Sequence, residues 1–402
     1  MDSVFSYKPD GVRDFLPELA SVKREVEEIL YGVFKQWGFE EVITPTFEYL
    51  ETFLMGYNFN SAEKIFKFLD RKGRVLALRP DMTTPIARVV ANYYKKINTP
   101  LRLCYFSNVF RFEESRGGRQ FESYQAGAEL IGVSGLEWDA EMISLAVESL
   151  KRLGIKDFKV SVGHTGFLKG VLDRLKDEKI KDQIHECFLN KDFVELKKIL
   201  DSSVLNEDIK KLVMNLTRSS GNLDNLEAYE GFDEYKIIAE AAAQLKEIKQ
   251  LLTIYGVEEY TAFDPSLIRA LDYYTGIIFE IYSPVIGFPL CGGGRYDNLI
   301  EKFNGSYPAT GFAFNIEGIL EILGGQKVIS SKSERFYLIC YDDVSREEAI
   351  KKAVKLRQNG YMTEMFKSKN VQSGIEYGKE KGFNKVIIFN NINEEVINLN
   401  KG

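Results

Sequence analysis

The chain has 402 residues, more than the roughly 100–200 of a typical single domain, so two packed units are expected. Its composition, 45% hydrophobic and 28% charged, is that of an ordinary globular protein. The formal net charge of −6 argues against a protein whose main task is to grip nucleic acid, although a local basic patch remains compatible with it.

The cysteines and histidines exclude several kinds of site. The four cysteines are scattered, without a C-x-x-C pair: Cys104, Cys187, Cys291 and Cys340. This pattern indicates reduced thiols in the cytoplasm, not a disulfide framework or a structural zinc site. With only His164 and His185, a histidine-based catalytic or metal centre is nearly excluded, and we expect no metal and no cofactor. Neither a signal peptide nor a membrane span of about 20 apolar residues is expected.

Hydrophobic periodicity predicts a first unit that mixes helices and strands. A helix is expected from Val22 to Trp37, ended by Gly38, and a turn at 70–73 predicts a hairpin. The other elements expected in this half are a short strand at 41–43, a helix at 83–96, strands at 101–111 and 123–131 joined by a loop at 113–120, a helix at 137–153 and a strand at 158–162.

The second half changes character. The segment 168–235 is rich in Lys, Asp and Leu and predicts a helical insertion of short helices. A strand at 276–282 and a helix at 311–323 would complete a core spanning 1–325. Residues 324–333 form the best candidate for a linker. Beyond it, a small α/β unit is expected at 334–402, with strands at 336–341, at 386–389 and near Val396. Between them, a helix would begin with a capping box at Ser345 and close at Asn359-Gly360, before a second short helix.

Six segments resemble, in order, the motifs of class II aminoacyl-tRNA synthetases and of histidyl-tRNA synthetase in particular. They are GVRDFLP at 11–17, GFEEVITPTFE at 38–48, LRPDMT at 78–83, FRFE at 110–113, LIRALDYYTG at 267–276 and CGGGRYD at 291–297. A single glycine-rich match would be weak, but six ordered matches span most of the chain. The resemblance implies an α+β fold whose core is an antiparallel sheet flanked by helices, with a helical insert where the sequence indicates one.

The same resemblance implies a pocket for free histidine. It places Asp81, Thr83 and Gln125 at the ammonium group, Arg269 at the carboxylate, and Glu129 and Tyr274 at the imidazole ring. Tyr273, Tyr296 and Arg295 fall in the two histidine signatures, where Tyr296 would line the ring. These residue types suit the ligand, because a specific pocket needs acceptors for the ammonium, a cation for the carboxylate and a partner for each ring nitrogen.

Each of these residues also has a simpler reading. Asp81 could be a turn residue after Pro80, and Tyr273-Tyr274 could be ordinary core aromatics. The glycines at 292–294 could form a plain turn, and Gln125 and Glu129 could lie on a solvated face. The histidine reading rests on all of these positions falling in register with one family.

The part of the family's site that binds the nucleotide lacks several of its expected side chains in this sequence. Arg111 matches the phosphate-binding arginine of the second motif. GFAFNIEG at 311–318 resembles the third motif, which normally ends in Glu-Arg, but here the arginine position is Gly318. The family also carries an arginine near Phe121 and a histidine at the position of Tyr124. Losing one such donor costs on the order of 100- to 1000-fold in rate, so we expect no catalytic residues and no useful adenylation.

This profile resembles a paralogous family, the regulatory subunits of short-form ATP phosphoribosyltransferase. That resemblance implies a non-catalytic subunit that pairs with itself, joins a catalytic phosphoribosyltransferase subunit and allows feedback inhibition by histidine. Binding of tRNA is not expected, because the C-terminal unit is short and lacks a basic stripe. Two alternatives stay open: an active histidyl-tRNA synthetase, and a histidine-binding regulatory module of another pathway.

Overall fold

A computed structural model describes most of the chain. The described residues are 8–56, 61–94, 100–115, 118–218, 236–269, 271, 273–326, 335–368, 370–390 and 393–399. The chain divides into two compact units, Met1–Ile329 and Ser330–Gly402. Each unit is described by itself.

The first unit is built on a large sheet with the strand order β1-β5-β6-β11-β10-β9-β7-β8. Its strands are β1 (Glu40–Glu41), β5 (Leu101–Ser115), β6 (Gly118–Ile131), β7 (Lys159–His164), β8 (Thr261–Phe263), β9 (Ile277–Tyr282), β10 (Cys291–Arg295) and β11 (Ala309–Asn315). The central strands are antiparallel, and only the outer pairs β1–β5 and β7–β8 are parallel. This is the expected α+β class, with the antiparallel sheet at its centre.

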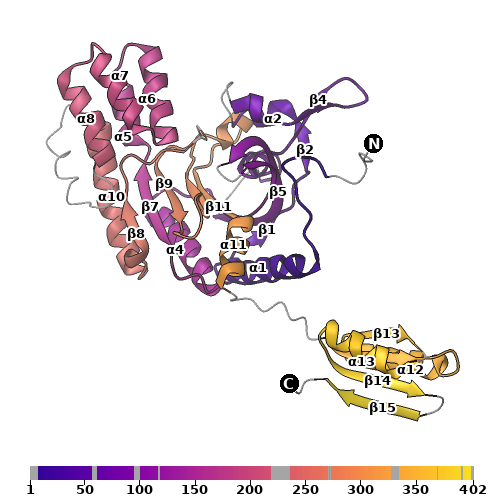
Figure 1. Cartoon of the computed structure of the whole chain (residues 1–402). Coiled ribbons are helices and arrows are strands. Elements are labelled where there is room, and N and C mark those ends of the chain that lie inside the picture. Colours follow the sequence, from indigo (N-terminus) through magenta and orange to yellow (C-terminus); the bar gives the residue numbers. More distant parts are fainter. Residues whose placement is uncertain are drawn as a thin grey trace. The chain divides into compact units, whose positions relative to one another are not determined.

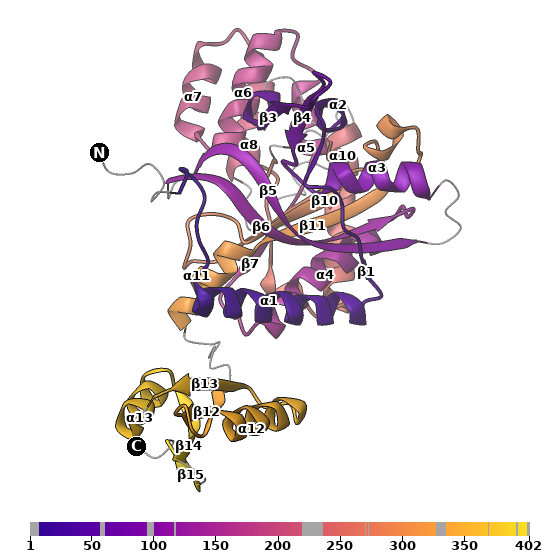
Figure 2. The ribbon, with the colours of Figure 1, turned by 90° about the vertical axis from the view of Figure 1, so that its right-hand side faces the viewer.

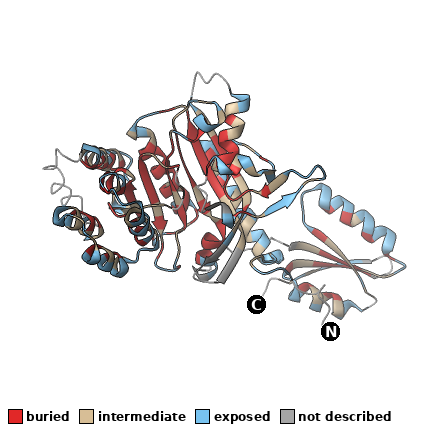
Figure 3. Ribbon diagram, turned by 90° about the horizontal axis from the view of Figure 1, so that it is seen from above, coloured by how far each residue is buried: buried red, intermediate tan, exposed pale blue. Residues whose placement is uncertain are grey.

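Helices cover one face of this sheet and build the main core. They are α1 (Pro17–Gln36), α4 (Leu136–Arg152) and α11 (Ile316–Gln326), which lie beneath the strands in Figure 2. Apolar side chains of α1 recur at helical spacing, and Val26, Leu30 and Phe34 are fully buried. Figure 3 shows the same layering, with buried strands and helices exposed on their outer sides.

The opposite face of the sheet carries α3 (Thr83–Tyr93) and a smaller cluster of buried side chains. The segment before α3 in the chain forms a second sheet of three strands with the order β2-β4-β3. The strands are β2 (Phe47–Tyr49), β3 (Lys67–Leu69) and β4 (Val75–Leu78), and the helices α2 (Leu50–Leu54) and η2 (Ser61–Lys64), a 3-10 helix, lie between β2 and β3 in the chain. The predicted hairpin around residues 70–73 is therefore confirmed.

A group of helices forms the insertion, which Figure 1 shows gathered beside β7 and β8. They are α5 (Gly166–Leu172), α6 (Glu178–Asn190), α7 (Phe193–Ser202), α8 (Glu207–Arg218) and α10 (Lys236–Ile254). Part of the predicted insertion, residues 219–235, lies outside the described residues. His164 joins the insertion to the sheet, because its Nδ1 accepts from the Gly166 amide at 2.9 Å and its Nε2 lies 3.0 Å from Gln244 Oε1.

Three expectations for the first unit were wrong. The predicted helix at 311–323 is the strand β11 up to Asn315, and only then the helix α11. The predicted loop at 113–120 is mostly strand, since β5 continues to Ser115 and β6 begins at Gly118. The predicted linker starts too early, because α11 runs to Gln326. The rest of that linker lies within 327–334, outside the described residues.

The second unit is a small α/β fold with the strand order β13-β12-β14-β15. Its elements are β12 (Arg335–Tyr341), α12 (Arg346–Gln358), β13 (Thr363–Lys367), α13 (Val371–Glu380), β14 (Phe383–Asn390) and β15 (Asn393–Asn398). The predicted capping box was wrong, because the Ser345 hydroxyl donates to Asp342 at 2.7 Å and makes no cap bond to α12. Nowhere in the described ranges is a helix both long and apolar enough to cross a bilayer.

Candidate functional site

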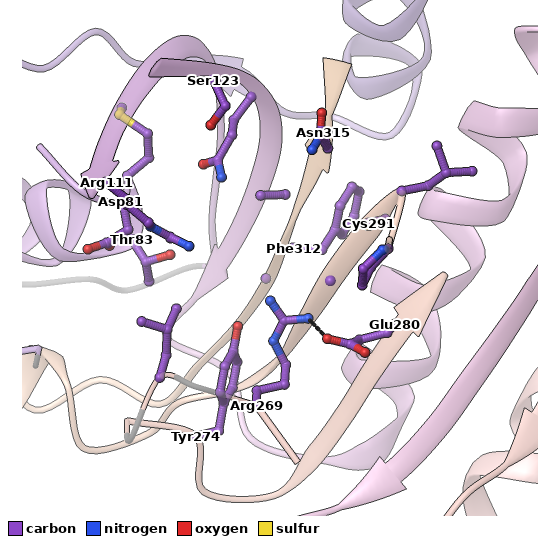
Figure 4. A pocket seen from close by; sticks show the side chains of 18 of the residues that line it. Asp81, Thr83, Arg111, Ser123, Arg269, Tyr274, Glu280, Cys291, Phe312 and Asn315 are labelled. Carbon is purple, nitrogen blue, oxygen red and sulfur yellow. Dashed lines mark hydrogen bonds and ion pairs between the residues drawn. The ribbon is translucent and has the colours of Figure 1, made fainter. Parts of the chain in front are cut away.

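A cavity of 380 Å³ opens on the α3 face of the large sheet, a size within the range of about 300–1,000 Å³ for small-molecule sites. Figure 4 shows its lining converging from β5, β6, the start of α3, the loop before β9 and the strands β9, β10 and β11. The polar and aromatic lining residues are Asp81, Thr83, Tyr105, Arg111, Phe121, Ser123, Gln125, Arg269, Tyr273, Tyr274, Glu280, Phe288, Tyr296, Phe312 and Asn315.

Strand β6 supplies one wall through its alternation. Side chains along a strand point alternately to opposite faces. Ala126, Ala128 and Leu130 therefore pack into the main core, while Gln125 lines the cavity and Glu129 lies on the same face behind the lining. The alternative that these residues lie on a solvated face is excluded for Glu129, which is 1% exposed, whereas Gln125 is partly buried and lines the cavity.

Glu129 lies at the centre of a buried hydrogen-bond cluster. The Thr83 hydroxyl donates to its Oε1 at 2.9 Å, and the Tyr296 hydroxyl donates to its Oε2 at 2.5 Å. Burial raises the pKa of Glu129 to about 8 against the lowering effect of these two donors. Burial of this group therefore favours its protonated form.

Gly311 makes room for this carboxyl group. It is the register partner of Glu129 on β11, and a Cβ at position 311 would lie 1.7 Å from Glu129 Oε2. A side chain at this position would displace the carboxyl group or push the two strands apart.

Asp81 is buried at the start of α3. Its carboxylate accepts from the Thr84 amide at 2.7 Å and from the Thr84 hydroxyl at 3.1 Å. These bonds satisfy a free amide of the helix start, so Asp81 has a structural role as well as a place on the cavity wall. A carboxylate has about four acceptor positions, so these contacts still allow it to accept from a ligand.

Arg269 lies on the opposite side of the cavity from Asp81. Its Nη1 pairs with Glu280 at 2.9 Å, and its guanidinium lies 5.6 Å from the centre of the Tyr274 ring (Figure 4). Burial alone would lower the pKa of Arg269, but Tyr274 and Glu280 hold it above its usual value. Gly292 lies under the guanidinium, and a Cβ there would be 1.7 Å from Nη1.

The aromatic residues of the two signatures lie together. The rings of Tyr273 and Tyr274 are 4.9 Å apart, and that of Tyr296 is 5.7 Å from Tyr273. Tyr273 belongs to the buried apolar cluster under α3 and also lines the cavity, so it is both a core aromatic residue and part of the cavity wall. Arg295 differs, because it is absent from the lining and instead pairs with Asp139 of α4 at 2.8 Å.

Apolar side chains surround Gly318, the position where the family resemblance expects an arginine. Gly318, at the start of α11, is buried, and a Cβ there would lie 3.1 Å from both Ile286 and Phe288 and 3.3 Å from Leu290. Phe288 and Leu290 also line the cavity. An arginine at position 318 would have to displace this apolar cover.

Phe121 lies near the second position where the family resemblance expects an arginine. Its ring stacks on Phe112, with centroids 4.7 Å apart, and meets Phe66 edge-on at 5.6 Å. Tyr124 is turned away from the cavity, with its ring against Phe15 and its amide donating to the Glu317 carboxylate. Within the described lining, the cations are Arg111 and Arg269. Arg111 donates from Nε to the Pro80 carbonyl at 2.6 Å.

The sequence reasoning missed several cavity residues, chiefly Glu280, Tyr105 and Asn315. Glu280 had a signal, because it is the single charged residue within the apolar strand IIFEIY. Tyr105 and Asn315 reach the cavity through their register with β6, which becomes visible only once the strand pairing is known.

The fold and cavity together define a histidyl-tRNA synthetase-like protein. The family described as "Histidyl-tRNA synthetase" matches residues 11–319. A solved histidyl-tRNA synthetase from Nostoc sp. PCC 7120 superposes with a TM-score of 0.78 at 20% identity, covering 95% of this chain and 91% of that one, which shows the shared fold.

Relatives with higher sequence identity show which family within this class the chain resembles. An ATP phosphoribosyltransferase regulatory subunit from Desulforamulus reducens is 39% identical over 390 residues, 96% of each chain. The crystal structure described as an ATP phosphoribosyltransferase regulatory subunit/histidyl-tRNA synthetase from Bacillus halodurans C has a TM-score of 0.82 at 33% identity, covering 96% of this chain and 99% of that one. The chain belongs to the family of ATP phosphoribosyltransferase regulatory subunits.

Proposed function

We propose that this chain is a non-catalytic regulatory subunit that binds free histidine and controls a catalytic short-form ATP phosphoribosyltransferase in the cytoplasm. The observation that carries the proposal is an asymmetry of the cavity. Its amino-acid side holds charged and hydrogen-bonding groups, whereas its nucleotide side is covered by Phe288, Leu290 and Phe121. The proposal therefore separates ligand binding from catalysis.

The polar groups of the cavity complement the parts of histidine. Asp81, Thr83 and Gln125 line one side and supply acceptors for an ammonium group, and Arg269 supplies the cation for a carboxylate on the other side. The proposal assigns the imidazole to Tyr274 on the cavity wall and to Glu129 just behind it. Because the Glu129 carboxyl group accepts from Thr83 and Tyr296, histidine would have to displace one of these hydroxyls to reach it. Tyr273 and Tyr296 would line the ring. Buried polar groups of this kind gain most from a ligand that completes their hydrogen bonds.

Adenylation needs cations around a developing phosphate charge. Arg111 supports the competing proposal, an active synthetase, because it lines the cavity at the matching position. Against that, Gly318 lies under apolar side chains and Phe121 is committed to an aromatic stack. Without cations at positions 121 and 318, we expect adenylation to be too slow to be useful.

Pairing of two copies is part of the proposal. The segment 38–48 resembles the first synthetase motif, which that family uses for dimerisation, and it exposes Ile43 and Phe47. Large apolar side chains are also exposed next to it, at Tyr49 and at Phe68 and Leu69 of strand β3. Phe47 and Phe68 are in edge-on contact, with ring centroids 5.7 Å apart, and exposed apolar side chains that gather in this way are typical of a protein interface. Sedimentation of the purified chain should show a dimer; a monomer at micromolar concentration would contradict this part.

The test of the site combines two measurements on the purified chain. Calorimetry should show saturable binding of histidine, and histidine-dependent ATP–pyrophosphate exchange should be absent. Exchange activity would establish the synthetase alternative. If histidine does not bind, both the proposed regulatory function and the synthetase alternative are wrong.

Tyr274→Ala serves as the site variant. Losing a hydrogen bond to a buried polar group of the ligand should weaken histidine binding roughly 10- to 100-fold. Tyr255→Ala is the control, because Tyr255 stacks on Trp37 away from the cavity. A Tyr274 variant with wild-type affinity would place the ligand elsewhere.

A further inference from the structure

Arg269 lies where the core meets the helical insertion. Besides the ligand cavity, it lines a second cavity of 610 Å³ together with Lys169 of α5 and His185 of α6. Its Nε is buried and has no hydrogen-bond partner within the described residues. The orientation of this guanidinium therefore depends mainly on its contact with Glu280.

The Glu280 contact continues outward as a chain of polar groups. The Tyr282 hydroxyl donates to Glu280 Oε2, on the same face of β9 two residues along. The ammonium group of Lys191 donates to the Tyr282 hydroxyl at 3.0 Å and lies 4.8 Å from the centre of its ring. A continuous series of side chains thus joins the cavity to the turn between α6 and α7.

Lys191 has an unusual backbone conformation for its residue type. It ends α6 with φ at 53°, in the left-handed region where glycine or asparagine is favoured. A residue with a Cβ is strained in this region, whereas glycine is not. Replacing Lys191 by glycine should therefore relieve the strain and remove the bond to Tyr282.

We propose that Lys191, Tyr282 and Glu280 form a positioning relay that orients Arg269 and couples carboxylate binding in the cavity to the helical insertion. This inference rests on the proposed histidine function and extends it to regulation. An arginine side chain loses rotamer freedom when it binds, so one already held by Glu280 binds a carboxylate with a smaller entropic penalty. Coupling is reciprocal, so a ligand on Arg269 also stabilises the α6–α7 turn.

The relay acts on the carboxylate alone, and this makes it separable from the rest of the pocket. Histidinol carries an alcohol in place of the carboxylate and keeps the ammonium and imidazole groups of histidine. A relay defect should weaken histidine binding and leave histidinol binding unchanged. General damage to the pocket should weaken both ligands.

The experiment is calorimetry of both ligands with the full chain and four variants. In Lys191→Met and Tyr282→Phe, the dissociation constant for histidine should rise about 3- to 10-fold, the effect of one hydrogen bond, with histidinol unaffected. Lys198→Met is the matched control, because this exposed lysine of α7 pairs only locally with Glu195, and it should behave as wild type.

Lys191→Gly separates the relay from folding. Glycine relieves the left-handed strain, so this variant should melt at the same or a higher temperature and still bind histidine more weakly. Wild-type histidine affinity in Lys191→Met and Tyr282→Phe would overturn the relay, as would an equal loss for histidinol. If the wild-type chain binds neither ligand, the proposed function itself has failed.

Discussion

At the scale of single residues, Glu129 is the cavity group for which burial of a charge is most costly. It is fully buried, yet its charged form is stabilised only by the hydroxyls of Thr83 and Tyr296. Neutral donors offset part of the desolvation of a carboxylate, which explains why its pKa is raised to about 8. A ligand that brings a further donor would favour the ionised form.

This raised pKa predicts a pH dependence of stability. The folded state keeps a proton on Glu129 that the unfolded state loses at the ordinary glutamate pKa of 4.5. The stability that this proton contributes is therefore fully present below pH 4.5 and is lost as the pH rises through about 8. The slope is at most about 1.4 kcal/mol per pH unit. Urea unfolding of ligand-free Glu129→Gln between pH 5 and 9 should lack this slope. Parallel curves for wild type and variant would contradict the assignment.

The residue scale also shows the limits of prediction from sequence. The residues that the family resemblance assigned to the pocket line one cavity, with Glu129 just behind the lining: Asp81, Thr83, Gln125, Arg269, Tyr273, Tyr274 and Tyr296. Their roles toward histidine remain proposals. Arg295 shows that motif membership does not give orientation, because its guanidinium turns to Asp139 and the backbone around Gly135.

At the scale of elements, glycines explain why one central strand was missed. The strand β10 was not predicted, because the run at 292–294 has the low strand propensity of glycine. The structure shows why side chains are excluded there. A Cβ at Gly293 would lie 2.2 Å from the Gly311 carbonyl, and one at Gly292 would strike Arg269. Such close approaches depend on tertiary packing, which local propensity does not contain.

Gly311→Ala tests the close pairing of β6 and β11. The added methyl group would meet Glu129 Oε2 at 1.7 Å and the Ala128 carbonyl at 2.8 Å, so we expect a stability loss of about 1–3 kcal/mol and at least roughly tenfold weaker histidine binding. Gly324→Ala in α11 is the control, because nothing lies within 4 Å of its added methyl group. That variant should gain about 0.5–1 kcal/mol and bind normally. Unaltered binding in Gly311→Ala would refute the role of Glu129.

The junction of β7, α5 and α10 should be sensitive to acid. Burial lowers the pKa of His164, so below about pH 6.5 the unfolded state takes up a proton more readily than the folded state and stability falls. His164→Asn keeps an acceptor for the Gly166 amide but cannot titrate. Between pH 8 and 5.5 its melting temperature should fall less than that of wild type. An equal fall in both proteins would assign the acid sensitivity to other groups.

At the scale of the whole molecule, the order of motifs was the most informative signal. Six short matches spread from 11 to 297 predicted the antiparallel core, and the structure confirms that fold. Residues 311–315 were predicted as helix because the apolar run GFAF was given more weight than Asn315, whose side chain accepts from the Gly318 amide at 3.0 Å where β11 ends and α11 begins. The apolar run alone could not locate that change.

The cavity proposed to bind histidine lies beside the helical insertion, because Arg269 lines both this cavity and a second one with Lys169 and His185. Regulation requires histidine to bind two states of the complex with different affinity. The relay from Lys191 to Arg269 offers one physical connection between the cavity and the outer helices.

The most direct test is the rate of phosphoribosyl transfer by a short-form catalytic subunit, measured alone, after mixing with this chain, and during titration with histidine. The proposed function predicts that activity rises on mixing and then falls in a saturable way as histidine is added. A competent catalytic subunit whose rate is unchanged by this chain, or a mixed complex that is indifferent to histidine, would contradict it.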